Sequence, residues 1–288
     1  MVYGVLKLIN FAHGDVMMVG VYVGYATALQ LGRAQQSLLG VSLVFAVAMA
    51  ACAGFGFLIE RFAYRPLREK PRLTALITAI GISFALSYGF QLDWRVTLWG
   101  HSFTLLPGAA PRAFPEIIRP TEWLVFGDRE VVIWNWQVIS FSIAVALMVG
   151  LQLLVFRTRF GRAMRAVSFD HRVAALMGIP TDRVIAGTFM LGSALVAGAG
   201  LLYAIKDTAV QPLMGLYVGL KAFVAAVIGG IGHVPGAVVG ALLLGLCEEF
   251  VVGYTSSSWR DAVAFGFLIV VLLVRPAGLF GRVTAEKV

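Results

Sequence analysis

A short polar stretch interrupts an apolar segment close to the start of the chain. Residues 4–25 are almost wholly apolar except at Asn10, His13 and Asp15, with Gly14 between the last two. Gly14 tolerates an irregular backbone, and Asp15 can cap the amides that open the following helix. A bare helix N-terminus would attract a carboxylate, but Asp15 competes for those amides. The stretch therefore predicts a helix break, with Asp15 either as a structural cap or beside a polar path.

The composition indicates that this break lies in a membrane protein. The 288 residues are 59% hydrophobic and 13% charged, with a mean hydropathy of +0.86. An ordinary soluble domain has about 45–50% apolar and about 25% charged residues. The apolar residues form long runs separated by short charged loops, which predicts one transmembrane domain over residues 1–288. Cys52 and Cys247 lie inside apolar runs without metal-ligand spacing, so we interpret them as packing residues.

We expect an all-α, polytopic integral membrane protein with about eight transmembrane helices, because backbone polar groups in lipid must be paired within the chain. The predicted spans lie near residues 16–31, 38–58, 73–92, 133–156, 184–205, 217–232, 234–254 and 262–280. The spans 16–31 and 217–232 are shorter than the about 20 residues that cross a bilayer core. We expect both to extend further or to be broken helices, and a break beside Asp15 would line a pathway.

The loops predict the orientation of the chain. Arginine and lysine gather in residues 60–72 and 157–183, as expected of cytoplasmic loops, so the net charge of +8 requires no nucleic-acid partner. Between them, residues 93–130 carry more acidic than basic side chains, and all six tryptophans fall in segments assigned to the outside. We therefore predict an outer loop at 93–130 and a cytoplasmic loop at 157–183.

Three ionisable residues, Lys221, Glu248 and Glu249, interrupt apolar runs toward the outer side. Each such charge costs about 2.5–3.5 kcal/mol at the bilayer centre, so these side chains must pair, face water or lie near the headgroups. We predict that Lys221 pairs with Glu248 or Glu249 across adjacent helices. The alternative is a charged rim that meets a partner protein or the ammonium group of a solute.

The cytoplasmic loop 157–183 has the pattern of a docking element. Its centre reads as a short amphipathic helix that Gly178 ends and Pro180 prevents from continuing. One side carries apolar residues: Val167, Val173, Ala174, Leu176 and Met177. An interfacial anchor that contacts only lipid headgroups is the alternative interpretation.

A glycine-rich stretch follows at residues 229–245. Small residues at four-residue spacing let helices approach closely in a membrane. We assign helix packing, together with a tight turn carrying His233 at its tip, to Gly229, Gly230, Gly232, Gly236 and Gly240.

Three stretches resemble the signature sequences of one family, in the same order. They are "YGVLKLINFAHGDVMMVGVYV", "RAMRAVSFDHRVAALMGIPTDRVIAGTF" and "VAAVIGGIGHVPGAVVGALLLG". They are similar to LivH-type permeases of the LivH/LivM family, the inner-membrane components of binding-protein-dependent ABC importers for branched-chain amino acids. The resemblance implies the ABC importer permease fold, multi-pass in the bacterial inner membrane. It also implies a further hydrophobic helix ahead of "MVYGVLKLINFAHGD", so that eight spans would understate the native number.

The resemblance implies partners as well. A homologous LivM-type permease, two ABC ATPase subunits and a periplasmic substrate-binding protein would complete an importer for a small amino-acid substrate. The family's coupling segment, which fits a groove on the ATPase, corresponds here to Arg165, Ala166, Val167, Ala174, Ala175, Leu176, Met177, Gly178 and Ile179. The chain has no G-x-x-x-x-G-K-[ST] motif, so ATP and Mg²⁺ are expected on the ATPase subunits and no cofactor in this chain.

Other functions stay open at this point. Members with the same architecture carry urea or short amides, and an ion-driven secondary transporter would need carboxylates buried at mid-membrane and often an inverted repeat. A membrane enzyme would need a cluster of catalytic or metal-binding residues, which the sequence does not offer; we expect no catalytic residue and no metal site.

Overall fold

The computed structural model describes residues 10, 12–68, 70–98, 101–126, 131–275 and 277–281. Within these residues, each predicted span corresponds to a helix. The helices are α2 (Ala12–Leu31), α3 (Leu38–Ile59), α4 (Arg72–Gly89), α5 (Asn135–Arg157), α8 (Thr181–Lys206), α9 (Met214–Gly229), α10 (Val234–Tyr254) and α11 (Arg260–Val274). Five helical segments of the described chain are long and apolar enough to cross a membrane: 38–67, 135–157, 181–206, 234–254 and 257–274.

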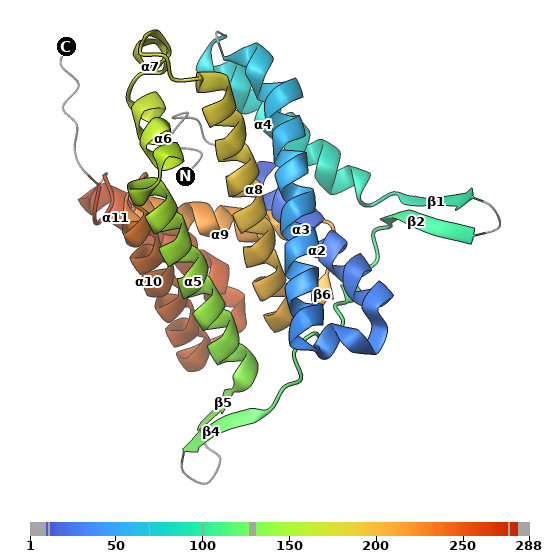
Figure 1. Cartoon of the computed structure of the whole chain (residues 1–288). Coiled ribbons are helices and arrows are strands. Elements are labelled where there is room, and N and C mark those ends of the chain that lie inside the picture. Colours follow the sequence, from blue (N-terminus) through green and yellow to red (C-terminus); the bar gives the residue numbers. More distant parts are fainter. Residues whose placement is uncertain are drawn as a thin grey trace.

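The two short predicted spans differ from each other. Helix α2 begins at Ala12 rather than at residue 16 and so reaches 20 residues. Helix α9 begins at Met214 and still has only 16 residues, a length of about 24 Å against a hydrocarbon core of about 30 Å. It lies across the long helices instead of alongside them (Figure 1). The predicted span at 217–232 is thus a short transverse helix.

The loops of like charge lie at the same end of the bundle. The turn between α3 and α4 and the short helices α6 (Arg159–Phe169) and α7 (His171–Leu176) lie at the upper end in Figure 1. The starts of α5 and α11, where Trp134, Trp136 and Trp259 lie, are at the lower end. This arrangement is compatible with the predicted orientation, in which the upper end is cytoplasmic.

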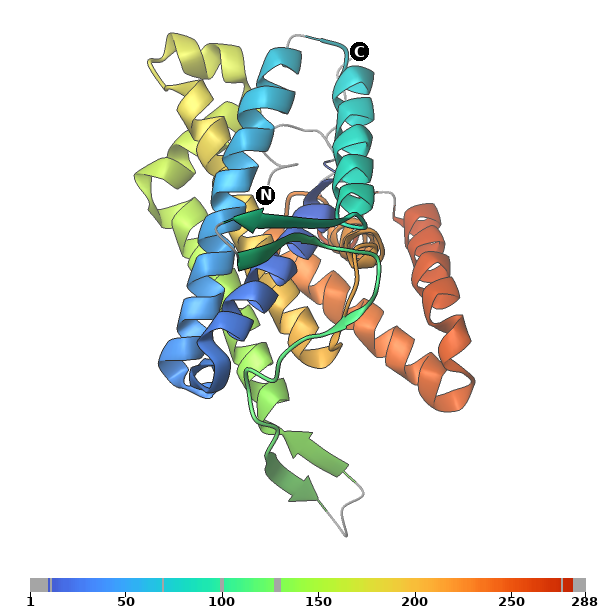
Figure 2. The same cartoon turned by 90° about the vertical axis from the view of Figure 1, so that its right-hand side faces the viewer.

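The predicted outer loop 93–130 contains strands that the sequence analysis did not foresee. Strand β1 (Asp93–Leu98) pairs with β2 (His101–Pro107), and β4 (Glu122–Phe126) pairs with β5 (Val131–Trp134), both antiparallel. The two hairpins project from the helices (Figures 1 and 2). A third pair, β3 (Arg112–Ala113) with β6 (Ala209–Val210), fastens the loop to the chain that follows α8.

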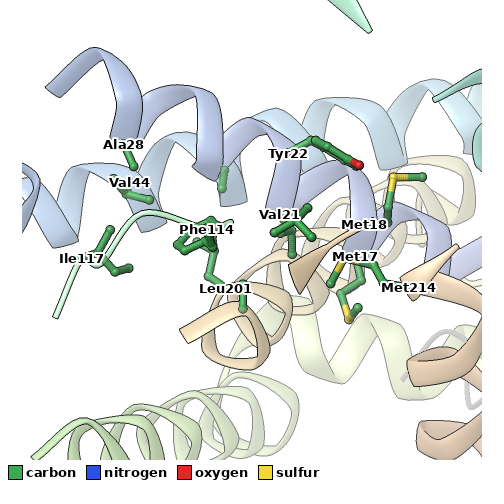
Figure 3. Close-up of a cluster of buried hydrophobic side chains, with 13 residues drawn as sticks. Met17, Met18, Val21, Tyr22, Ala28, Val44, Phe114, Ile117, Leu201 and Met214 are labelled. Carbon is green, nitrogen blue, oxygen red and sulfur yellow. The ribbon is translucent and has the colours of Figure 1, made fainter. Parts of the chain in front are cut away.

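The core forms where α2, α3 and α8 pack together. Met17, Met18 and Val21 of α2 meet Leu201 of α8 and Met214 of α9 in a buried cluster (Figure 3). Close approach depends on small residues, as is usual between membrane helices. A Cβ added at Gly20 would lie 2.7 Å from the Cβ of Ala197, and one at Gly56 would collide with the side chain of Ser193. Larger residues at these two sites would separate the helices.

The outer helices contribute much less to this core. Helix α5 has no buried residue among its 23 residues. Helix α4 is buried along one narrow row of small residues, Ala75, Ala79, Ser83 and Ser87, spaced four apart. Their remaining surfaces carry large exposed apolar side chains, as expected of surfaces that meet lipid or another subunit.

Candidate functional sites

The polar stretch at the N-terminus organises the start of α2. The side-chain oxygen of Asn10 accepts hydrogen bonds from the amide of Ala12 at 3.1 Å and from the hydroxyl of Tyr64 at 2.9 Å. Its amide nitrogen lies 3.2 Å from Nδ1 of His13. Asn10 therefore holds the first turn of α2 to the end of the α3 segment, at Tyr64. Helix α2 includes His13, Gly14 and Asp15, so the predicted helix break is wrong at these residues, and only Asn10 of the four lies ahead of the helix.

Asp15 has a different role from the predicted one. The helix starts at Ala12, three residues ahead of Asp15, so the prediction that Asp15 caps a helix opening at Val16 is wrong. The fully buried carboxylate instead accepts a hydrogen bond from the hydroxyl of Ser87 at 2.6 Å and another from Ser83. These bonds join α2 to the narrow buried row of α4. The sequence signal for this contact was two serines one helical turn apart in a mostly apolar helix.

Gly14 forms the contact between α2 and the transverse helix α9. A Cβ at Gly14 would collide with the carbonyl of Gly215 and lie 3.1 Å from Cα of Gly219. The predicted pathway residues Asn10, His13, Gly14 and Asp15 thus gather where α2, α4, α9 and Tyr64 meet. Gly14 and Asp15 are buried at this junction, Asn10 and His13 are half-buried, and a part in a pathway remains a proposal.

The predicted coupling segment is built from two helices and not from one. Helix α6 ends at Phe169, and Asp170 adopts an extended conformation before α7. The Asp170 carboxylate caps α7, accepting hydrogen bonds from the amides of Arg172 at 2.8 Å and Val173 at 3.1 Å. The amide donors of Val173 and Arg172 hold the pKa of the Asp170 carboxyl below its ordinary value. The prediction of one continuous amphipathic helix is therefore corrected to two helices joined at a sharp bend.

The end of α7 is fixed by a Schellman motif. Gly178 has φ of +79° and donates to the carbonyl of Ala175 at 3.0 Å, while the amide of Ile179 donates to Ala174 at 3.1 Å. This pairing satisfies the carbonyls that the helix end leaves free. Pro180 then begins the turn into α8, as the sequence predicted.

The apolar residues of the segment divide into two sets. Val167 and Ala174 are buried against α8 together with Met164. Leu176 and Met177 are 87% and 78% exposed. Phe169, which the sequence analysis did not single out, is 91% exposed. The buried set attaches the segment to the bundle, and we name Phe169, Leu176 and Met177 the exposed ridge.

Arg165 and Ala166 complete the predicted coupling set on α6. The guanidinium of Arg165 donates to the carbonyl of Val155 at 3.0 Å and stacks over the ring of Phe156, with 5.1 Å between Cζ and the ring centroid. Arg165 thus fixes α6 to the end of α5, while Ala166 is half-buried.

Buried and exposed charges join the base of this segment to the first basic loop. Arg68 pairs with the buried carboxylate of Glu60 and with Asp182, the latter at 2.5 Å. Arg65 also pairs with Asp182. The sequence analysis had interpreted these arginines only as orientation signals, because their partner Asp182 lies more than a hundred residues away.

The outer charges form an ionic cluster among α9, α10 and α11. Lys221 Nζ lies 3.2 Å from Glu248, the predicted pairing, and 2.9 Å from Asp261. Arg260 pairs with Glu249 at 3.2 Å. Asp261 and Arg260 were missed from the sequence because they belong to the start of α11, where charges at a membrane interface are unremarkable.

Most of the predicted packing glycines lie in the contact of α9 with α10. A Cβ at Gly229 would collide with the carbonyl of Gly236, and one at Gly240 with the carbonyl of Ala225. At Gly232, by contrast, an added Cβ would meet no atom within 4 Å. Gly232 instead allows the turn, because its φ is +93°.

The turn after α9 is closed by two contacts. Nδ1 of His233 accepts a hydrogen bond from the amide of Gly236 at 2.9 Å and caps α10. The chain after α11 also contacts this turn. The amides of Leu279 and Phe280 donate to the carbonyls of Ile228 and Gly229, at 2.8 and 3.3 Å respectively. A Cβ added at Gly230 would lie 2.5 Å from the amide nitrogen of Gly281. In the described part of the chain, His233 joins no group of three metal-binding side chains.

These features define a polytopic membrane protein: apolar helices of spanning length, basic loops at one end and an exposed apolar ridge at that same end. The sequence profile of the family described as branched-chain amino acid transport system / permease component matches residues 1–272. The chain belongs to this family, and the predicted family and all-α membrane fold are confirmed. It is a multi-pass inner-membrane permease component.

Named relatives agree with this assignment. The chain is 40% identical over 293 residues to the high-affinity branched-chain amino acid transport system permease protein BraD of Pseudomonas aeruginosa, covering 100% of this chain and 91% of that protein. It is equally similar to LivH of Escherichia coli K12, covering 100% and 90%. A probable LivH of Methanocaldococcus jannaschii is 24% identical, covering 94% and 82%. No solved structure gave a significant match.

Proposed function

We propose that this chain is the permease subunit of an ABC importer that moves branched-chain amino acids into the cell. The observation that carries the proposal is the 40% identity to BraD and LivH over the full length of the chain. Similarity over all helices and loops favours the same transport role and not merely the same fold. In this proposal the chain itself catalyses no reaction.

The exposed ridge supports the proposal that ATP hydrolysis on separate subunits drives transport. Phe169, Leu176 and Met177 are large, apolar and exposed at the basic end of the molecule. Such exposed apolar residues at the ends of two short helices suit insertion into a groove of a partner protein. Two ATPase subunits, carrying ATP and Mg²⁺, would occupy this end; a LivM-type permease would lie alongside, with a substrate-binding protein at the opposite end.

Reconstitution of the whole importer tests the proposal. The chain is co-expressed with the second permease and the ATPase subunits, placed in proteoliposomes and supplied with the binding protein. We expect leucine, isoleucine and valine to stimulate ATP hydrolysis and to be taken up, whereas urea and acetamide should do neither. If urea or acetamide stimulates ATP hydrolysis and the branched-chain amino acids do not, the proposed substrate is wrong. Uptake without the ATPase subunits would refute the ATP-driven mechanism.

The coupling role is tested separately by Leu176→Asp. A charge in the ridge should lower leucine-stimulated ATP hydrolysis about tenfold or more, because an apolar anchor at a protein interface often contributes 2 kcal/mol or more. Arg172→Gln is the matched control, since Arg172 is exposed on the same helix but outside the ridge. Equal activity of both variants would contradict a docking role for the ridge.

A further inference from the structure

A cavity of about 210 Å³ lies between the predicted outer loop and the last turn of α8. Its apolar wall includes Phe114 and Ile117, which are buried and belong to the same cluster as Leu201 (Figure 3). Trp136 at the start of α5 and Ile205 near the end of α8 line it as well. Most of the cavity surface is therefore apolar, as in sites for small organic ligands, although it is smaller than the about 300–1,000 Å³ that drug-sized ligands occupy.

Two opposite charges, Glu116 and Lys206, also line this cavity. Both side chains are exposed, so each is free to turn toward a ligand. The last turn of α8, residues 204–206, forms part of the wall. The carbonyls of a helix C-terminus carry partial negative charge, which favours a cation beside them. The cavity thus presents negative groups, one positive group and an apolar surface.

The walls of the cavity are held in place by hydrogen bonds. The amide of Phe114 donates to the carbonyl of Thr208 at 2.8 Å, next to the β3–β6 pair. On the other side, the side chain of Gln36 donates to the backbone carbonyl of Glu116 at 3.1 Å. Both connections tie the outer loop to the helical core. A cavity formed before its ligand arrives loses less entropy on binding.

We propose that this cavity is a binding site for a small zwitterionic amino acid with an apolar side chain. The ammonium group would lie by Glu116 and the carbonyls at the end of α8, the carboxylate by Lys206, and the side chain against Phe114, Ile117 and Trp136. A ligand with only a positive charge would be repelled by Lys206, and one with only a negative charge by Glu116. The arrangement therefore favours a molecule that carries both charges. The inference rests on the proposed function and adds to it a subsite within this chain at the outer face.

Equilibrium binding of radiolabelled leucine tests the site, using the complete permease–ATPase complex in nanodiscs without the binding protein. We expect saturable binding to the wild type. Removing one charge from the ligand should weaken competition about tenfold, the loss expected for one charged hydrogen bond. The competitors are 4-methylpentanoate, which lacks the ammonium group, and 3-methylbutylamine, which lacks the carboxylate.

Two variants separate the roles of the two charges. Glu116→Gln should weaken leucine binding about tenfold and leave competition by 4-methylpentanoate unchanged. Lys206→Met should also weaken leucine binding but leave competition by 3-methylbutylamine unchanged. Glu122→Gln is the matched control for Glu116→Gln, because Glu122 belongs to the outer loop but does not line the cavity. This control should bind leucine as the wild type does.

Uptake measurements keep this proposal distinct from the proposed function. If the importer with its binding protein takes up leucine but the complex alone shows no saturable leucine binding, the cavity proposal is refuted and the proposed function stands. Leucine binding that is equal in wild type, Glu116→Gln and Lys206→Met refutes it too. If saturable, charge-dependent binding is found but uptake of branched-chain amino acids is absent, the cavity proposal stands and the proposed function fails.

Discussion

The hydroxyl of Ser87 donates a hydrogen bond of 2.6 Å to the carboxylate of Asp15 in the interior of the helix bundle. Ser83, one turn earlier on α4, donates to the other carboxylate oxygen. Apart from these bonds, the fully buried residues of α4 are small, and Ile82 and Leu86 pack against the core while partly buried. Asp15 is therefore a principal attachment of α4 to α2.

Asp15→Ala should release this attachment. Both serine hydroxyls would lose their acceptor, and we expect the free energy of unfolding to fall by about 1–3 kcal/mol. The loss is smaller if a serine hydroxyl instead donates to a backbone carbonyl of α4. Thermal unfolding of the purified complex measures the loss. Ser142→Ala is the control, since the hydroxyl of Ser142 donates to the carbonyl of Val138 within its own helix α5. Wild-type stability with altered leucine uptake would instead support a direct pathway role.

Gly240→Ala should destabilise the contact of α9 with α10. The added methyl group would collide with the Ala225 carbonyl, and such overpacking typically costs about 1–3 kcal/mol. Gly245→Ala on the same helix meets no atom within 4 Å and should be neutral or slightly stabilising. Thermal unfolding of the two variants side by side checks this, and equal behaviour would contradict the packing shown.

Lys221→Glu should destabilise the outer ionic cluster. The new carboxylate would face Glu248 and Asp261, the present partners of Lys221. We expect a loss of about 1–2 kcal/mol, because the site is only partly shielded from solvent. The exchange variant Lys221→Glu with Glu248→Lys should recover part of the thermal stability. Failure of the exchange to restore any stability would show that the cluster does not act through this pair.

The cap of α7 should weaken in acid. Because the folded-state pKa of Asp170 lies below its ordinary value of 3.8, the stabilisation is fully present above that value. It is lost as the pH falls through the lowered pKa. Hydrogen exchange of residues 171–177 between pH 7 and 3, corrected for the intrinsic rate, should show this loss. Asp170→Asn keeps the acceptor without titrating, so a response like that of the wild type would contradict the assignment.

Hydropathy was sufficient to predict where the helices lie. In a membrane an apolar run of about 20 residues forms a helix, because its backbone groups must be hydrogen-bonded within the segment. Hydropathy was insufficient for the direction of α9, since a mostly apolar sequence does not show which helices it crosses. The length of α9, 16 residues, was the one available signal.

Site residues were harder to predict because their roles depend on partners distant in sequence. Asp15 was recognised as unusual, but its partner Ser87 follows 72 residues later, and two serines one helical turn apart do not by themselves indicate which residue they bind. In the coupling segment, Asp170 is itself a strong helix-capping residue. The apolar pattern extended across it, and that continuity was mistaken for one helix.

The residues beyond α11 help to close the end of α9. The amides of Leu279 and Phe280 donate hydrogen bonds to the carbonyls of Ile228 and Gly229. Ile228 and Gly229 are buried, so loss of these two donors would leave their carbonyls without a hydrogen bond. The polypeptide must therefore be synthesised as far as Phe280 before the end of α9 is closed. Proteolysis or a premature stop ahead of Leu279 would leave an unfinished helix in the middle of the protein, even though every spanning segment had been made.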